Sequence, residues 1–464
     1  MNKTVSEFLT EHASAGPISF HMPGHKGARF YRENGCADFL DKLVDLDITE
    51  IPGADNLFQT EGIIKETMEH YRRLYDVRAS YLLVNGSSCG LIASIMTCVP
   101  GGGKLIMARN CHKSVFNGLN LAGAEPVYAY PEMVEEYGIT GEIAADEIKR
   151  CLEEAPDAAA VLLPSPNYYG ICSDISGIAA AVHQQGKLLI VDQAHGAHLN
   201  FLDKSKAAER LGADIVIDSI HKTLASFTQS AVVNICSDKI ELYDFEDALQ
   251  KLESTSPSYL LMASLDMNCK ILESRGRELM EEWRGSLDWF YDKAETVAGL
   301  EVMKHAGLDD SKINLDMSAH GLDGLTLERE LMKRNIFPEL VTGNIVMCMT
   351  GIGNKRCDYE ALAEALSDIG KAFPLTENRI AAVPTWQLRD LKQHAVPTKK
   401  IRLPLGDACG RVCAQSIIPY PPGIPMVCPG EELSREVIDY VTELRARGEN
   451  VMGVDEEGRV VVGY

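Results

Sequence analysis

Short runs of apolar residues recur between about residues 60 and 240, and amphipathic segments separate most of them. The runs show little polar alternation, which is typical of strands in a sheet that is covered on both faces. They are SYLLVNG (80–86), KLIMA (104–108), EPVYAYP (125–131), AAAVLLPS (158–165), KLLIVDQA (187–194), DIVIDSI (214–220) and AVVNICS (231–237). Intervening segments such as DISGIAAAVHQQG have helical spacing and end on a glycine that suits a helix C-cap. The pattern predicts an α/β domain with a mostly parallel sheet.

The character of the chain changes after a long helical pattern over about 257–292. Strand-like runs at 300–304, 312–318 and 344–350 then alternate with helical segments, which predicts a smaller α+β domain. A length of 464 residues favours two or three domains. We therefore expect an N-terminal segment (1–60) that borders the active site, a large domain (61–293) and a C-terminal α+β domain (294–464).

Composition and charge narrow the class of protein. The chain is 45% hydrophobic and 24% charged, as expected of a globular protein. A net charge of −22 argues against nucleic-acid binding and favours cationic small molecules. The chain begins without a signal-peptide pattern and has no apolar run of membrane-spanning length. Thirteen cysteines, an odd number, without a CxxC pair, suggest reduced thiols, a cytoplasmic location and no metal site.

Ligands of open α/β sheets bind beyond the carboxyl ends of the strands, so the residues that follow each predicted strand carry the chemistry. A hydroxyl pair at the start of a helix suits phosphate, although helix capping is the simpler reading of that pair alone. A histidine at a strand end could stack on a flat ring, and a carboxylate that ends a buried strand requires a cation. The four strand ends supply Ser87 and Ser88, then His112, then Asp192, and finally His221 with Lys222.

One cofactor needs all four features. Pyridoxal 5'-phosphate has a phosphate, a flat ring, a pyridinium nitrogen and an aldehyde that forms an imine with lysine. The first strand–helix junction lacks a GxGxxG turn, which weakens a nicotinamide alternative. Each residue alone is a weak signal, and their order along one predicted sheet makes pyridoxal phosphate the favoured cofactor.

The chain resembles the bacterial Orn/Lys/Arg decarboxylase family of fold-type I pyridoxal-phosphate enzymes, in its short form. The resemblance covers nearly the whole chain. It is carried by FHMPGHKG (20–27), DITEIPGADNL (47–57), LVNGSSCG (83–90), RNCHKSV (109–115), VDQAHGAH (191–198), DSIHKT (218–223), STSPSYLLMASLD (254–266) and PYPPGIP (419–425).

The resemblance implies a role for each matching residue. Lys222 would form the imine, Asp192 would pair with the pyridine nitrogen, and His112 and Ala194 would cover the two ring faces. The phosphate would be held by Ser87, Ser88, Ser219 and His221. Thr255 would reach the phosphate of the neighbouring subunit, which implies a homodimer with shared active sites and leaves larger assemblies open.

The implied reaction is decarboxylation of lysine, ornithine or arginine to cadaverine, putrescine or agmatine, a polyamine-forming step. Two alternatives remain at this point: another fold-type I reaction, such as transamination or β-elimination, and a non-catalytic regulatory homologue. The substrate's distal cation needs an acid, and the candidates are Asp47, Glu50, Asp55, Asp407 and Glu431, although a solvated or capping carboxylate is the simpler interpretation of most of them. Gln193 and Gln415 stand where the family often has glutamate, so each either alters the substrate or reflects drift away from the site.

Overall fold

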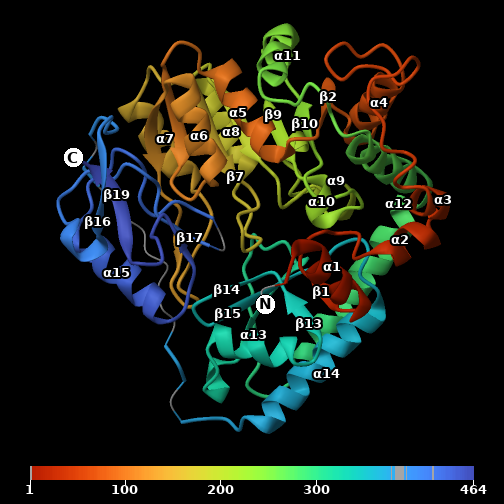
Figure 1. Ribbon diagram of the computed structural model, residues 1–464, viewed down its shortest axis with the longest axis vertical. Helices are drawn as coiled ribbons and strands as arrows, with labels where there is room; N and C mark the ends of the chain where they lie inside the picture. Colours follow the sequence, from red (N-terminus) through yellow and green to blue (C-terminus); the bar gives the residue numbers. More distant parts are fainter. Residues whose placement is uncertain (1–2, 378, 382–390, 393, 421–422) are drawn as a thin grey trace.

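A seven-stranded sheet forms the centre of the large domain in the computed structural model, which describes residues 3–377, 379–381, 391–392, 394–420 and 423–464 (Figure 1). The strand order is β2-β10-β9-β8-β7-β3-β4, and only β10 runs antiparallel to its neighbours. The strands are β2 (Ala79–Leu83), β3 (Lys104–Ala108), β4 (Glu125–Ala129), β7 (Ala160–Pro164), β8 (Leu188–Asp192), β9 (Ile215–Asp218) and β10 (Ala231–Ile235). All seven predicted strands are present, so the predicted fold class is confirmed.

Two hydrophobic clusters bury the sheet, which explains why its strands lack polar alternation. One cluster joins the sheet to α5 (Gly86–Cys98), α6 (Lys113–Ala122), α7 (Ala145–Glu154), α8 (Ile175–Gln184) and α11 (Leu242–Gln250). The other includes α4 (Ile63–Tyr75) and the long helix α12 (Tyr259–Ala294), and continues into the small domain. Helix α8 ends just before Gly186, whose φ of +68° agrees with the predicted glycine stop.

The small domain is built on an antiparallel sheet of order β11-β12-β15-β14. Its elements are β11 (Glu301–Val302), β12 (Lys312–Asp316), α13 (Gly324–Met332), β13 (Ile336–Pro338), β14 (Leu340–Thr342), β15 (Ile345–Met349) and α14 (Arg356–Ala372). The N-terminal strand β1 (Ile18–Phe20) pairs in parallel with β13, so the N-terminal segment lies beside the small domain (Figure 1). It also contains α1 (Val5–Ser14), α2 (Ala28–Glu33) and α3 (Ala37–Asp41).

The last part of the chain has a hydrophobic cluster of its own, drawn from residues 405–462. It contains β16 (Lys400–Pro404), β17 (Ile418–Pro419), α15 (Arg435–Ala446), β18 (Val451–Met452) and β19 (Arg459–Gly463). In Figure 1 this C-terminal unit lies beside the large domain and apart from the small-domain sheet. The single C-terminal domain expected over 294–464 stays a prediction, and its described residues contain two separate cores.

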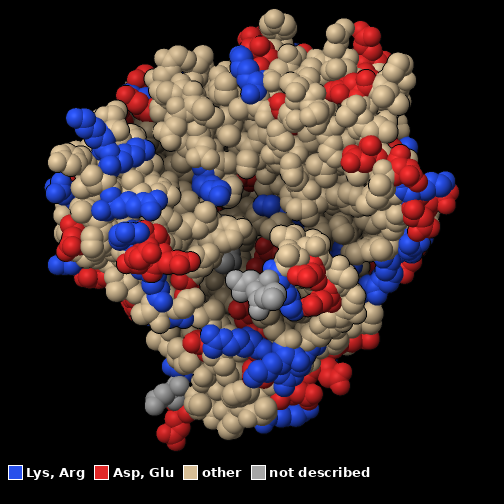
Figure 2. Space-filling model, in the orientation of Figure 1, with Lys and Arg blue, Asp and Glu red and all other residues tan. Residues whose placement is uncertain are grey.

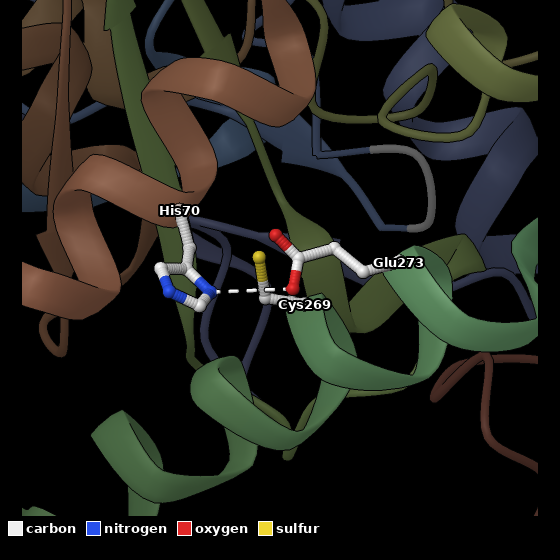
Figure 3. Close-up of side chains that lie close together, drawn as sticks. All are labelled: His70, Cys269 and Glu273. Carbon is white, nitrogen blue, oxygen red and sulfur yellow. Dashed lines mark ion pairs between the residues drawn. The ribbon is translucent and has the colours of Figure 1, made fainter.

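Helices α4 and α12 also meet through polar side chains (Figure 3). His70 Nδ1 lies 3.3 Å from Glu273 Oε2, its Nε2 lies 3.1 Å from Glu66, and the Cys269 sulfur is close by. Because both ring nitrogens face carboxylates, we interpret this cluster as an ion-paired contact between helices.

All thirteen cysteines are free thiols. Among the described residues, no helix combines the length and apolar character needed to cross a bilayer.

Candidate active site

A pocket opens at the carboxyl ends of the sheet. Figure 2 shows this face of the molecule hollowed at its centre, with basic and acidic side chains inside. The pocket is lined by five of the predicted site residues, which are Ser87, His112, Asp192, Ala194 and Lys222. These residues span 135 positions in the sequence, and the strand order brings them together because their strands end at one edge of the sheet.

Lys222 lies on α10 (Ile220–Thr223), the single helical turn that follows β9. Its Nζ lies 2.9 Å from His195 Nε2. Burial lowers the pKa of Lys222, and the charges of Asp192 and Glu339 oppose that effect. A buried lysine with a depressed pKa gives up its proton more readily than a surface lysine, as a nucleophilic amine must.

Asp192 is the last residue of β8, and its Oδ1 accepts a hydrogen bond of 3.1 Å from the Ala194 amide. Burial raises the pKa of this carboxyl, and the Lys222 charge lowers it. A cationic group placed against Asp192 would hold it ionised, since an opposite charge favours the charged form. The protonated nitrogen of a pyridine ring is such a group.

His112 caps α6, and its Nδ1 accepts from the Ser114 amide at 3.3 Å and lies 2.8 Å from the Ser114 hydroxyl. Burial, and then the charge of Lys222, lower the pKa of His112 to about 4. The imidazole is therefore neutral at neutral pH. A flat, uncharged ring fixed by its own cap is well suited to stack on another ring.

Groups that can bind an anion occur on the two segments that contribute Ser87 and Lys222 to the pocket. Ser87 and Ser88 lie in the first turn of α5, where free amides and the helix dipole favour negative charge. The buried Ser219 hydroxyl has no hydrogen-bond partner among the described residues. His221 Nδ1 donates to the Ser230 carbonyl at 2.9 Å, which fixes its ring beside the same turn.

The N-terminal motif packs on the backbone of the lysine turn. The Gly24 amide donates to the His221 carbonyl at 2.7 Å, and a Cβ at Gly24 would lie 2.4 Å from the Thr223 carbonyl carbon. The Gly24 carbonyl in turn accepts from the Gly353 amide at 3.0 Å. Only glycine fits at position 24, because the lysine turn and a small-domain loop approach it from two sides.

The comparisons with known proteins agree with this geometry. The model of the Orn/Lys/Arg decarboxylase major domain matches residues 5–305, and the model of the C-terminal domain of the same family matches residues 377–460. The chain belongs to the Orn/Lys/Arg decarboxylase family. Members of this family are decarboxylases that use pyridoxal phosphate, and the chain is an enzyme of this kind.

Relatives of the family match along most of their length. The uncharacterized protein YaaO of Bacillus subtilis is 32% identical and covers 98% of this chain and 96% of its own. An arginine decarboxylase of the same organism is 31% identical and covers 97% and 94%. The solved lysine decarboxylase LdcF of Francisella novicida, 19% identical, superposes with a TM-score of 0.75 over 95% of this chain and 78% of its own, which shows a shared fold.

The cofactor of the decarboxylase family fits the side chains in this pocket. The buried Ser219 hydroxyl has no partner among the described residues and can donate to a phosphate, and the pocket-lining carboxylate of Asp192 can pair with a protonated ring nitrogen. Of the residues predicted to hold the cofactor, Ser88, Ser219 and His221 do not line the pocket itself. Thr255 is exposed in the loop before α12, and its contact with a neighbouring subunit stays a prediction.

His195 and Tyr168 are among the pocket-lining residues that the sequence did not single out. His195 contacts Lys222, and the ring centroids of His195 and Tyr168 lie 4.5 Å apart. Burial, and then the charge of Lys222, lower the pKa of His195 well below its usual value. Both residues follow strand ends, Tyr168 after β7 and His195 after β8, so extending the strand-end reading to β7 would have found Tyr168.

Gln193 does not contact the pocket. Its Nε2 donates to Asp218 at 3.0 Å and to Glu209 at 3.0 Å, and its Oε1 accepts from the Ala208 amide at 2.8 Å. Of the two alternatives for Gln193, this position favours drift away from the site, because the side chain serves a buried network. Gln415 is exposed on the C-terminal unit, and its role stays open.

The acids considered for the distal cation have other roles or positions. Asp55 accepts from the amides of Glu61, Gly62 and Ile64 at 2.9 Å and so caps α4. Glu431 is buried against Arg109 at 3.2 Å. Asp47 and Asp407 are exposed, and Glu50 lines a different cleft near Asp55.

Proposed function

We propose that this enzyme removes the α-carboxylate of arginine, lysine or ornithine as carbon dioxide and releases agmatine, cadaverine or putrescine. The observation that carries the proposal is the pocket in which Lys222, Asp192 and His112 meet. Arginine is the first substrate to test, because four relatives that are 28–31% identical are named arginine decarboxylases. The net charge of −22 also suits a cationic substrate.

Pyridoxal phosphate, when bound, supplies an electron sink for the electron pair of the broken Cα–carboxylate bond. Lys222 would hold its aldehyde, and His112 and Ala194 would hold its ring between them. Ser87, Ser88, Ser219 and His221 would hold its phosphate. Asp192 would keep a proton on the ring nitrogen by ion pairing, and this proton is what makes the sink effective.

His195 orients the reactive amine. Since the depressed pKa of His195 leaves it neutral, its Nε2 accepts a hydrogen bond from Lys222 Nζ. The amine thereby points into the pocket, in position to give a proton to the substrate's Cα after carbon dioxide has left. Tyr168 and Ile424 line the same pocket and exclude water from it.

The active site is proposed to lie at the interface of a cytoplasmic homodimer. Thr255, exposed before α12, would donate its hydroxyl to the phosphate bound in the neighbouring subunit. A Thr255→Ala variant should then bind the cofactor more weakly even though Thr255 lies outside the pocket of its own chain.

The proposed function is tested by incubating the purified enzyme with arginine, lysine and ornithine and measuring carbon dioxide and amine. Borohydride reduction should attach the cofactor covalently to Lys222, and Lys222→Ala should abolish both the adduct and the activity. Lys239→Ala, at an exposed lysine, serves as the control and should change neither. Keto acid or ammonia without carbon dioxide would refute decarboxylation.

A further inference from the structure

Glu339 places a carboxylate of the small domain beside the active site. It lies between β13 and β14, and its Oε2 accepts a hydrogen bond of 2.8 Å from the Met22 amide. Burial raises the pKa of this carboxyl, and the charges of Lys26, Lys222 and Lys312 act in the opposite direction. The influence of Lys222 on Glu339 shows that the two groups share one electrostatic environment.

Glu339 has no ion-pair partner within the part of the chain that the structure describes. The three nearby lysines are committed elsewhere. Lys26 Nζ donates to the carbonyls of Met349, at 3.0 Å, and His21, and Lys222 Nζ contacts His195. A largely buried carboxylate without a cation is costly, so the site favours the arrival of one.

The buried Lys312 ammonium is the third of these lysines. Its Nζ donates to Asp309 at 3.1 Å, to Ser311 Oγ at 3.1 Å and to the His195 carbonyl at 3.0 Å. All three of its donor positions are therefore used, and none is left for Glu339.

Tyr168 connects Glu339 to the pocket. Its ring lines the pocket beside His195. Burial, and then the negative charge of Glu339, raise the pKa of the Tyr168 hydroxyl, so this pocket residue lies within the electrostatic reach of that carboxylate. A carboxylate has about four lone-pair positions, and the Met22 amide occupies one of them.

We propose that Glu339 binds the distal cationic group of the substrate, so that the small domain selects amino acids whose side chain ends in a guanidinium or an ammonium. This inference rests on the proposed function. The remaining lone pairs of Glu339 match two N–H groups of a guanidinium or one ammonium. The acids suggested by sequence cap a helix, pair with arginine, are exposed or line a different cleft, so Glu339 takes the role that was assigned to them.

The test compares a charged substrate with its neutral counterpart in Glu339→Gln. Citrulline matches arginine without the charge, and norleucine matches lysine. We expect kcat/KM for the basic substrate to fall about 10- to 100-fold, as for the loss of one charge-assisted hydrogen bond. The Ki of the neutral counterpart as a competitive inhibitor should change less than about twofold, because its side chain has no charge that the Glu339 carboxylate could bind. Glu360→Gln, at an exposed position on α14, is the matched control.

Equal losses for charged and neutral compounds in Glu339→Gln would overturn the inference, because they would indicate a structural role. If that variant does not fold, Glu339→Asp decides the question. It retains the charge but withdraws it by one methylene, so the relative kcat/KM of arginine and ornithine must shift, and an unchanged ratio would also overturn the inference. A wild-type enzyme that releases no carbon dioxide from any basic amino acid would instead refute the proposed function.

Discussion

Replacing Arg109 with methionine should detach the C-terminal unit from the large domain. The Arg109 guanidinium donates to the carbonyls of Pro425, at 2.6 Å, and Met426, at 2.8 Å, and pairs with Glu431 at 3.2 Å. Its central carbon lies 5.2 Å from the ring of Tyr128. Glu431 is 1% exposed, so Arg109→Met removes the cation that lies 3.2 Å from a buried carboxylate.

Breaking a buried ion pair from one side costs about 3–5 kcal/mol. At 1.4 kcal/mol for each factor of ten, the C-terminal unit should open a hundredfold more often or more. Hydrogen exchange followed by mass spectrometry measures this opening directly. Peptides from 425–463 should exchange faster in Arg109→Met, and peptides from the seven-stranded sheet should not. Ile424 lines the pocket, so KM should rise as well.

A second substitution separates the lost charge pair from a general packing defect. Arg109→Met with Glu431→Gln removes the carboxylate charge together with the cation and should recover a large part of the protection. Arg150→Met is the control, because Arg150 pairs with Glu147 and Glu154 at the surface and should cost less than about 1 kcal/mol. Equal exchange in Arg109→Met and Arg150→Met, or no recovery in the double variant, would refute the reasoning.

Three further predictions concern packing and pH. Gly24→Ala should cost about 1–3 kcal/mol of stability and reduce cofactor fixation by borohydride, because the new Cβ would clash with the lysine turn. The control is Gly285→Ala on α12, where the new Cβ meets no atom within 4 Å and should stabilise the helix. The pKa of His112 is about 4 in the folded protein, so the unfolded chain binds more protons than the folded protein as pH falls from 6.5. The apoprotein should therefore lose more stability in acid than His112→Phe. An equal dependence of the two unfolding free energies on pH, measured with urea from pH 7 to 4, would contradict this. Burial lowers the pKa of Lys26 to about 7, although the charge of Glu339 opposes this effect. Above pH 7 the lysine therefore binds more protons in the unfolded chain than in the folded protein. In the same assay, wild type should gain stability relative to Lys26→Met between pH 7 and 10.

The sequence predicted the sheet well because burial on both faces leaves a local signature. An apolar run such as Leu188–Val191 can be recognised without knowledge of its neighbours, and the residue that ends it must lie at the ligand edge. The reversed direction of β10 has no such signature, since an antiparallel strand buried on both faces is equally apolar.

The parts of the site that depend on distant pairing could not be predicted. Glu339 lies in a turn between two three-residue strands, and no local pattern marks it as part of a site 117 positions from Lys222. Asp55 and Glu431 were plausible acids until their partners were known. The sequence alone does not show whether a carboxylate already accepts hydrogen bonds from backbone amides or already pairs with a guanidinium.

The N-terminal motif gives the enzyme a built-in order of assembly. Gly24 is held between the lysine turn, about 200 residues later, and the loop at Gly353, more than 300 residues later. The set of contacts around Gly24 can therefore be complete only after synthesis has passed the small domain. A nascent chain can form its large sheet before the glycine that packs on the lysine turn is held from both sides.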